Sequence, residues 1–223
     1  MKQIAVVMIL GALPMLAAND AVKRLQDSAT VLSEVMATPD KAIPQDLLNS
    51  ADCIVVVPGV KKAAFIVGAK YGRGFISCRN ENGVGWSAPG GVRVEGGSFG
   101  FQIGGSETDV IMLIKNRRGA EKLMKDKVTL GADASVAGGP VGRTSSAETD
   151  AMMHAEILTW SRSRGLFAGV ALNGATLRPD DDTNRDLYGS SMPEKDIVFG
   201  NVPPPAGAQP LLTELNRYSS RKG

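Results

Sequence analysis

The hydrophobic pattern of this chain changes its period at Cys53, and that change limits the folds it can adopt. Before Cys53, apolar residues such as Leu25, Ala29 and Leu32 recur at helical spacing on one face. After it, they gather in short runs rich in β-branched and aromatic residues, broken by glycine. The N-terminal part is therefore predicted to be helical, and the part from Cys53 onward to be built mainly from strands. The predicted N-terminal helices are Asp20–Ala37 and Gln45–Ala51.

Glycine separates the predicted strands and indicates how they bend. The chain holds 26 glycines, densest between Gly83 and Gly105, which indicates bulges, tight corners and close backbone approach. The segment Asn80–Gly83 has the composition of a turn between two strands. The predicted strands are 53–57, 63–71, 74–79, 84–89 and 110–115, and strand-like segments return at 128–136, 151–162 and 166–177.

Three further segments have helical or turn-like patterns. Arg117–Lys125 and Gln209–Ser219 are predicted helices, the second following the stiff spacer Pro203–Pro205. Asp180–Tyr188 is predicted to be a capped turn or a short helix. There is no tandem repeat and no domain-sized linker in 223 residues. We therefore expect a single α+β domain, with a mostly antiparallel β-sheet system flanked by N-terminal, middle and C-terminal helices.

Composition excludes some classes of partner and cofactor. The formal net charge is only +2, so bulk electrostatics give little support to nucleic-acid binding, and we expect no nucleic-acid partner. Two cysteines and one distant histidine do not make a metal ligand set, so no metal site is expected. The chain has neither phosphate-binding glycine motif, and no cofactor is predicted.

The first residues have the pattern of an export signal. A short positive start is followed by the apolar run Ile4–Leu16 and by small residues up to Ala18. This pattern predicts a signal peptide over residues 1–18, a mature chain that begins at Asn19, and a periplasmic or secreted location. The alternative is an uncleaved segment retained as a membrane anchor.

Cys53 and Cys78 are the two cysteines, and each lies in a β-like run. An exported chain meets an oxidising environment, so a disulfide forms if the two runs pair. The alternative is a pair of buried free thiols.

A hydrolase is the enzyme class that the motifs suggest, and the context of those motifs argues against it. Ser98 sits in a G-x-S-x-G pattern, and His154 could act as its base. That pattern requires a strand–turn–helix context, whereas Ser98 falls in a glycine-rich β region, and His154 is predicted to be a partly buried strand residue. We therefore expect no enzymatic activity, and we expect Trp86 and Trp160 to be core or rim aromatics.

Several ordered blocks resemble the SYLF domain, a family of lipid-headgroup-binding modules often fused in eukaryotes to Src-homology domains of actin regulators. The blocks are Ala51–Pro58, Trp86–Pro89, Ser163–Val170, Asn184–Arg185 with Tyr188–Gly189, and Ile197–Gly200. The resemblance covers nearly the whole chain after the signal peptide and implies an SYLF-like lipid-binding domain over residues 19–223. It also implies binding of phosphoinositides or other anionic lipids, helped by an amphipathic N-terminal helix and basic surface residues.

Basic residues near two of these blocks are the candidate headgroup ligands, because anionic headgroups need cationic side chains and backbone donors. The first group surrounds a predicted hairpin and the second precedes an apolar run; the residues are Lys61, Lys62, Lys70 and Arg73, then Arg162 and Arg164. The alternative is that they are solvated charges at strand ends. The expected partner is an anionic phospholipid membrane, and the alternative partner is a cell-envelope protein bound through a sheet edge or the N-terminal helix. That helix is expected either to pack on the domain or to lie on the membrane.

Overall fold

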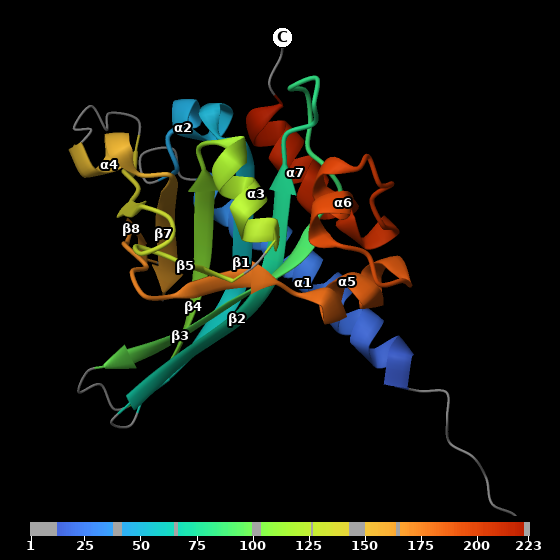
Figure 1. Ribbon diagram of the computed structural model, residues 1–223, viewed down its shortest axis with the longest axis horizontal. Coiled ribbons are helices and arrows are strands. Elements are labelled where there is room, and N and C mark those ends of the chain that lie inside the picture. The colour runs from blue at the N-terminus through green and yellow to red at the C-terminus, as the bar shows by residue number, and fades with distance from the viewer. Residues whose placement is uncertain are drawn as a thin grey trace, which may run out of the picture.

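The chain forms one long, strongly twisted sheet with helices on both faces (Figure 1). The computed structural model describes residues 13–37, 42–64, 67–99, 104–125, 127–142, 150–163 and 166–220. The strands among them are β1 (Cys53–Ala64), β2 (Val67–Cys78), β3 (Gly90–Phe99), β4 (Gly104–Ile114), β5 (Val128–Thr129), β6 (Val136–Gly138), β7 (Ile157–Ser163), β8 (Leu166–Gly169) and β9 (Thr176–Pro179). The helices are α1 (Leu13–Met36), α2 (Gln45–Ser50), α3 (Arg117–Lys125), α4 (Asp150–His154), α5 (Asp181–Tyr188), α6 (Glu194–Phe199), a 3₁₀ turn η1 (Ala206–Ala208) and α7 (Gln209–Ser219).

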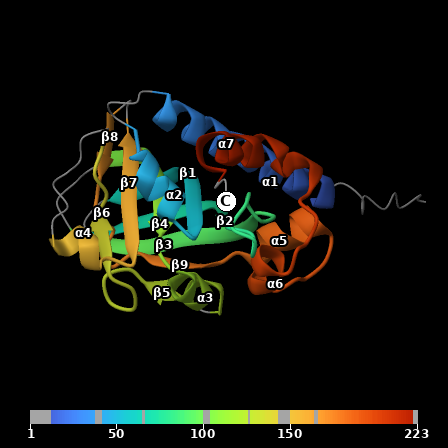
Figure 2. The same cartoon turned by 90° about the horizontal axis from the view of Figure 1, so that it is seen from above.

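The strands follow the order β5-β9-β3-β2-β1-β4-β7-β6, and β8 pairs with β7. The pairings are antiparallel except for that of β6 with β7. Helices α1 and α7 lie side by side over one face, while α3 lies on the other side of the sheet (Figure 2). The structure therefore confirms the predicted α+β class and the mostly antiparallel sheet flanked by helices.

Strand alternation produces two hydrophobic cores, one on each face of the sheet. On the α1 face, Phe75 and Trp160 pack with helix residues such as Leu25 and Leu32. On the opposite face, Val55, Ile76 and Met112 pack with Leu123 of α3. Both tryptophans are buried, at 6% exposure for Trp86 and 0% for Trp160, which confirms their prediction as core aromatics.

Helix periodicity was a reliable signal in this sequence. The predicted bounds of α3 and α7 match the structure, and α2 differs from its prediction by one residue. Helix α1 ends at Met36, one residue before the predicted end, but it begins already at Leu13. The predicted cleavage point after Ala18 therefore lies inside α1, while residues 1–12 lie outside the described residues; the signal peptide stays a prediction. In the described part of the chain, no helix combines the length and apolar character that a membrane crossing requires.

Several predicted strands were wrong because glycine and turns hide the strand pattern. The run 63–71 spans the end of the β1–β2 hairpin, and 84–89 contributes only a bridge from Trp86 to Arg79, whereas the glycine-rich β3 is the true third strand. Gly90 of β3 packs against Glu194: a Cβ there would lie 2.1 Å from the Glu194 Oε1. Glycine in β3 thus allows close approach of α6, which a search for apolar runs does not detect.

The C-terminal half also departs from the prediction. Helix α4 occupies the start of the predicted strand 151–162, so β7 begins only at Ile157. The segment 166–177 divides into β8 and the first residues of β9, and 128–136 contains β5 and a turn. Asp180–Tyr188 forms α5 with Gly189 as a left-handed C-cap, and α6 was not predicted.

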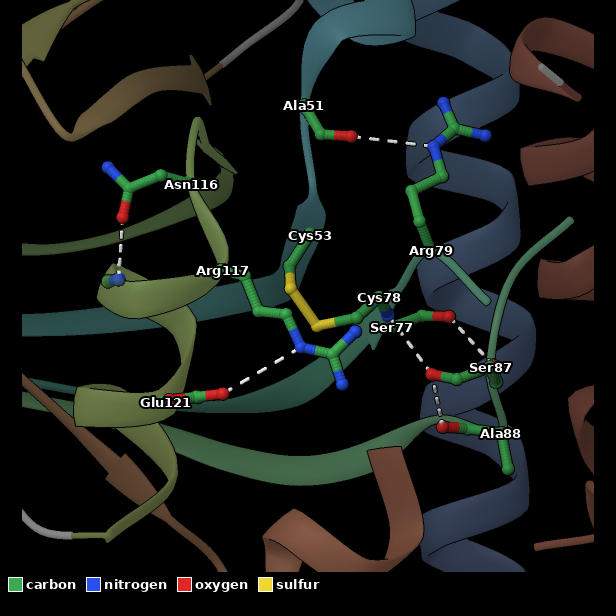
Figure 3. Close-up of a disulfide and its surroundings, with 11 residues drawn as sticks. Ala51, Cys53, Ser77, Cys78, Arg79, Ser87, Ala88, Asn116, Arg117 and Glu121 are labelled. Carbon is green, nitrogen blue, oxygen red and sulfur yellow. Dashed lines mark hydrogen bonds and ion pairs between the residues drawn. A yellow bond between two sulfur atoms is a disulfide. The ribbon is translucent and has the colours of Figure 1, made fainter. Parts of the chain in front are cut away.

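Cys53 and Cys78 are direct partners in the β1–β2 register and form a buried disulfide (Figure 3). The alternative of two free thiols is therefore wrong. The next residue, Arg79, is also buried and stacks on Trp86 at 3.8 Å from the ring centroid. Its guanidinium donates to backbone carbonyls of Leu48, Ala51 and Ser219, at the C-terminal ends of α2 and α7, where a cation is favoured. At this end of the sheet, the disulfide thus joins β1 to β2, and Arg79 joins β2 to the ends of α2 and α7.

We predict that reducing the disulfide lowers the free energy of unfolding by about 3.5 kcal/mol, the loop-entropy value for a 25-residue separation. Urea unfolding of the wild type with and without reductant measures it. A Cys53→Ala/Cys78→Ala variant is the control and should be insensitive to reductant. Equal stability of the wild type under both conditions would contradict the prediction.

Candidate functional site

A groove of about 630 Å³ lies between α1 and the sheet, and it collects several of the predicted ligand residues. Lys61 of β1, Arg73 of β2 and Arg162 of β7 all line it, although they lie far apart in the sequence. From α1 it receives Lys23 and Arg24. The structure thus brings together cations from the two predicted groups, which the sequence alone left separate.

Carboxylates neutralise the two predicted arginines of the groove. Arg162 pairs with Asp109 at 2.8 Å and also with Glu34 of α1. Burial lowers the pKa of the Arg162 guanidinium, hydrogen bonds to Glu34 and Asp109 raise it, and the net shift is upward. Arg73 pairs with the buried Asp180 at 2.9 Å. These arginines hold α1 and the start of α5 to the sheet, so they are not free solvated charges.

A bulge in β1 shapes the floor of the groove. Gly59 has φ +60°, and the register of β1 shifts on either side of it. Its N–H donates to Asp109 Oδ1 at 2.9 Å, which fixes the carboxylate that receives Arg162. The left-handed conformation at this position favours glycine.

The predicted lysine cluster is divided between the two faces of the sheet. Lys61 pairs in register with Tyr71 and Glu107, and all three belong to the α1 face. Lys70 is one residue from Tyr71 along β2, so it belongs to the opposite face, and it pairs in register with Lys62. Arg164 lies outside the described residues.

Lys62 and Lys70 belong to a part of the sheet that projects beyond the helices (Figure 1). We call it the arm and define it as residues 61–64 and 67–71 with 96–99 and 104–107. Within the described residues, these segments of β1 to β4 pair only with one another, because β9 pairs with β3 up to Glu95 and β7 pairs with β4 from Asp109 onward. The arm is a four-stranded extension that carries charge away from the body.

The arm contains three lysines and one acidic residue, Glu107, which is the register partner of Lys61. Lys62 and Lys70 are direct register partners on β1 and β2, positions at which like charges are unfavourable. The outer register partners of this pair are Ser106 and Gly96, neither of them acidic. Within the described side chains, no ion pair involves Lys61 or Lys70. Tyr71, 45% exposed beside Lys61, adds an aromatic ring of the kind favoured at membrane interfaces.

A buried polar network fixes α5 and α6 against the edge of this site. Asn184 accepts from the Gly91 N–H at 2.6 Å and donates to Glu194 at 2.5 Å, while the Tyr188 hydroxyl donates to Pro89 O at 2.7 Å. Burial raises the pKa of Glu194 to about 8, although the hydrogen bond from Asn184 acts in the opposite direction. Burial and the nearby Glu194 also raise the pKa of the Tyr188 phenol. The Asn184 and Tyr188 blocks singled out in the sequence are therefore structural.

A comparison with models of known protein families shows which family this chain belongs to. The family model described as Ysc84, Las17-binding protein actin regulator, matches residues 95–218, more than half of the chain. The chain belongs to the Ysc84 family. This confirms the SYLF resemblance, since Ysc84 is the family of that domain.

Individual proteins that are similar in sequence to this chain support its membership in the Ysc84 family. SH3 domain-containing YSC84-like protein 1 is 35% identical over 205 residues in Rattus norvegicus and 34% in Homo sapiens; each match covers 92% of this chain and 59% of the relative. LAS seventeen-binding protein 3 of Saccharomyces cerevisiae is 33% identical over 180 residues, covering 79% of this chain and 39% of that protein. The chain thus spans about three fifths or less of these relatives. The name of the yeast relative describes a binding protein.

The hydrolase alternative does not fit this Ysc84-family fold. Ser98 lies within β3, opposite Gly68, in a hairpin context and not in a strand–turn–helix turn. His154 is exposed on α4, so its prediction as a partly buried strand residue was wrong. Strand β3 and strand β7, which follows α4, are four strand spacings apart, about 19 Å. Among the described residues, no group of three or more His, Cys, Asp or Glu side chains could hold a metal ion.

Sequence reasoning missed several charged residues of this region. Arg24 reaches the groove from α1, and Arg93 and Arg178 extend the charged surface across β3 and β9. The alternation of apolar and charged residues in Val92–Glu95 could have predicted a strand with Arg93 on its polar face. The residues beside Arg93, however, depend on the pairing of β3 with β9, whose partners are more than 80 residues apart in the chain.

We predict that Glu194→Gln removes a pH dependence of stability. The folded protein keeps Glu194 protonated up to about pH 8, whereas the unfolded chain ionises it near pH 4.5. The free energy of unfolding of the wild type should therefore fall relative to the variant as pH rises from about 4.5 to about 8. The expected slope over this interval is about 1.4 kcal/mol for each pH step of one.

Urea unfolding of both proteins at pH 5 and at pH 8.5 measures this difference. Asp196→Asn, which neutralises an exposed carboxylate of the same helix, is the control and should follow the wild type. An unchanged pH profile in Glu194→Gln would show that Glu194 is ionised in the folded protein.

Proposed function

We propose that this chain is a non-catalytic module that binds anionic phospholipid membranes through the arm. The observation that carries the proposal is that Lys62 and Lys70 are register partners on a projecting part of the sheet, with Lys61 on the opposite face of the same part. An anionic surface relieves the repulsion between facing lysines, and basic residues near such a surface contribute about 1 kcal/mol each. The membership in the Ysc84 family supports the proposal through the SYLF resemblance.

The groove contributes less to this function than the sequence suggests. Arg73 and Arg162 are occupied by Asp180, Asp109 and Glu34. Helix α1 buries its apolar stripe, including Leu25 and Leu32, on the domain, so that stripe is not available to a membrane in this conformation. The arm is therefore the proposed contact surface.

We predict that Lys62→Gln/Lys70→Gln weakens partition to anionic vesicles roughly 30-fold, the loss expected for two basic residues at about 1 kcal/mol each. Co-flotation with phosphatidylcholine vesicles containing phosphatidylglycerol, at low and moderate salt, measures it. Wild-type binding should weaken as salt rises, because exposed charges are screened.

The matched control is Lys195→Gln/Arg217→Gln, which removes two positive charges from α6 and α7, far from the arm (Figure 1). The control should float like the wild type. Equal flotation of both double variants would move the lipid contact away from the arm, and no flotation of the wild type would overturn lipid binding itself.

Protein binding is the second candidate function, and an open strand edge favours it. Residues 104–108 of β4 pair with β1, but no described strand pairs with their other side. Such an edge offers backbone donors and acceptors to an added strand. The family description names Las17 binding and actin regulation. A protein that binds this chain would take the place that Las17 has in that description. This function predicts capture of one defined protein that is insensitive to vesicles and to the lysine substitutions.

The proposed place of action is outside the cytoplasm, in the periplasm or the secreted fraction. A buried disulfide is typical of oxidising compartments, and residues 1–18 have the pattern of a signal peptide. We predict that N-terminal sequencing of the exported protein starts at Asn19. A chain that retains Met1 and stays with the cell membrane would support the anchor alternative instead.

A further inference from the structure

A pocket of about 250 Å³ lies between α3, α6 and the loop that follows β2. The loop contributes Trp86, α3 contributes Arg117, and the chain from the end of α6 contributes Phe199, Val202 and Pro203. We call it the α3–α6 pocket. Pockets for drug-sized ligands usually have volumes of roughly 300–1,000 Å³, so this smaller pocket suits a single large apolar side chain.

The walls of the α3–α6 pocket are held in place by the protein itself. Asn201 has a left-handed backbone with φ +54°, which asparagine tolerates better than most residues, and it turns the chain from the end of α6 toward Pro203 and Pro204. Each proline fixes its own φ. In the loop after β2, the buried Trp86 donates its indole N–H to Ser219 O at 2.9 Å. A side chain that enters the pocket therefore requires little ordering of the protein.

Arg117 lines this pocket as a cation with weak internal partners. Its guanidinium lies over the Phe199 ring, 4.3 Å from the ring centroid, and its side chain is 45% exposed. The guanidinium lies 3.7 Å from the Glu121 carboxylate and 4.0 Å from that of Glu81, and both carboxylate side chains are exposed (Figure 3). Ion pairs between exposed side chains contribute little to stability. A ligand carboxylate can therefore replace them, while the aromatic ring keeps the guanidinium in place.

The helices beside the pocket present more positive than negative charge to solvent. Among their described side chains that reach solvent, the cations are Arg117, Arg118, Lys122 and Lys195, and the anions are Glu121 and Asp196. The loop adds Glu81, so cations still outnumber carboxylates. None of the described ion pairs includes Arg118 or Lys122. These two lie four residues apart on α3, a spacing at which like charges are unfavourable, and an acidic ligand offsets that repulsion.

We propose that the α3–α6 pocket binds an acidic peptide segment of a partner protein, with one apolar side chain inserted into the pocket and a neighbouring carboxylate on Arg117. An apolar anchor in a pocket, surrounded by polar contacts, is the usual arrangement of a binding hot spot. The pocket and the arm lie at opposite ends of β2 (Figure 1): Arg79, which also lines the pocket, follows Lys70 by nine residues, about 30 Å along a strand. Peptide binding at the pocket therefore does not depend on membrane binding by the arm.

The two tryptophans of the chain give a direct readout, because Trp86 lines this pocket and Trp160 does not. The probe is a synthetic peptide with one leucine between three acidic residues on each side, titrated into ¹⁵N-labelled protein. The Trp86 indole N–H signal should shift saturably, and that of Trp160 should stay in place. A peptide with alanine in place of leucine should bind about tenfold more weakly, because less apolar area is buried. A peptide with lysines in place of the acidic residues should not bind.

Arg117→Gln tests the carboxylate contact from the side of the protein. It should weaken binding of the acidic leucine peptide about tenfold, the loss of a charge-assisted contact. The matched control is Lys70→Gln, which removes one positive charge at the other end of β2 and should bind the peptide like the wild type. The peptide substitutions leave the protein unchanged, so they test the proposal even if Arg117→Gln does not fold.

Three outcomes would overturn the proposal. The first is an unchanged Trp86 signal at millimolar acidic peptide. The second is equal binding of peptides with acidic, neutral and basic flanks, which would leave an apolar pocket with no requirement for acid. The third is a Trp86 shift that follows the protein concentration without any peptide, which would assign the pocket to a second copy of this chain. Vesicle flotation of the same samples keeps the two proposals apart, because loss of flotation with peptide binding intact would count against the arm alone.

Discussion

One end of the four central strands projects beyond the helices that cover the sheet, and the arrangement of charge in this protein depends on that projection (Figure 1). Strands β1 and β2 have 12 residues each, about 40 Å when extended. Helices bury both faces at the disulfide end, where residues 53–57 and 74–78 are all buried. Further along the same strands, Lys61 and Tyr71 are exposed. One sheet thus carries an apolar end that holds the fold together and a polar end that meets solvent.

The boundary between these two ends explains why Arg73 and Arg162 of the groove are ion-paired. Arginines at the boundary are partly buried, and an unpaired charge there would lose hydration without compensation. Asp180 supplies the required anion for Arg73, and Asp109 does so for Arg162. Each pair also joins elements far apart in sequence, so the same contacts that neutralise charge position α1 and α5. Arg73 and Arg162, which were predicted to bind a headgroup, therefore hold helices to the sheet instead.

The sequence predicted what local patterns determine and missed what strand pairing determines. Helices α3 and α7 follow from apolar periodicity, and the disulfide follows from two β-like runs that pair. Strand β3 was missed because glycine replaces the side chains that mark a strand. Alternation alone separates Lys61 from Lys62, but the neutralisation of Arg73 needs Asp180, 107 residues away in the chain. The alignment of Arg73, Arg93 and Arg178 across β2, β3 and β9 is still less visible, because it depends on a register between β3 and β9 that no local pattern specifies.

Lysine and arginine divide the basic surface of this chain according to their chemistry. Lysine is a strongly hydrated point charge, suited to a diffuse anionic surface, and the arm presents lysines at its exposed end. Arginine loses less on partial burial and binds directionally, and Arg73 and Arg162 lie partly buried where the helices begin to cover the sheet. Charges at the exposed end are screened by salt within about 10 Å at 0.1 M, whereas partly buried guanidinium groups are screened much less. Lys61 of the arm and the groove arginines Arg73 and Arg162 therefore differ in salt sensitivity for a physical reason, since the first is an exposed charge and the second two are partly buried in ion pairs.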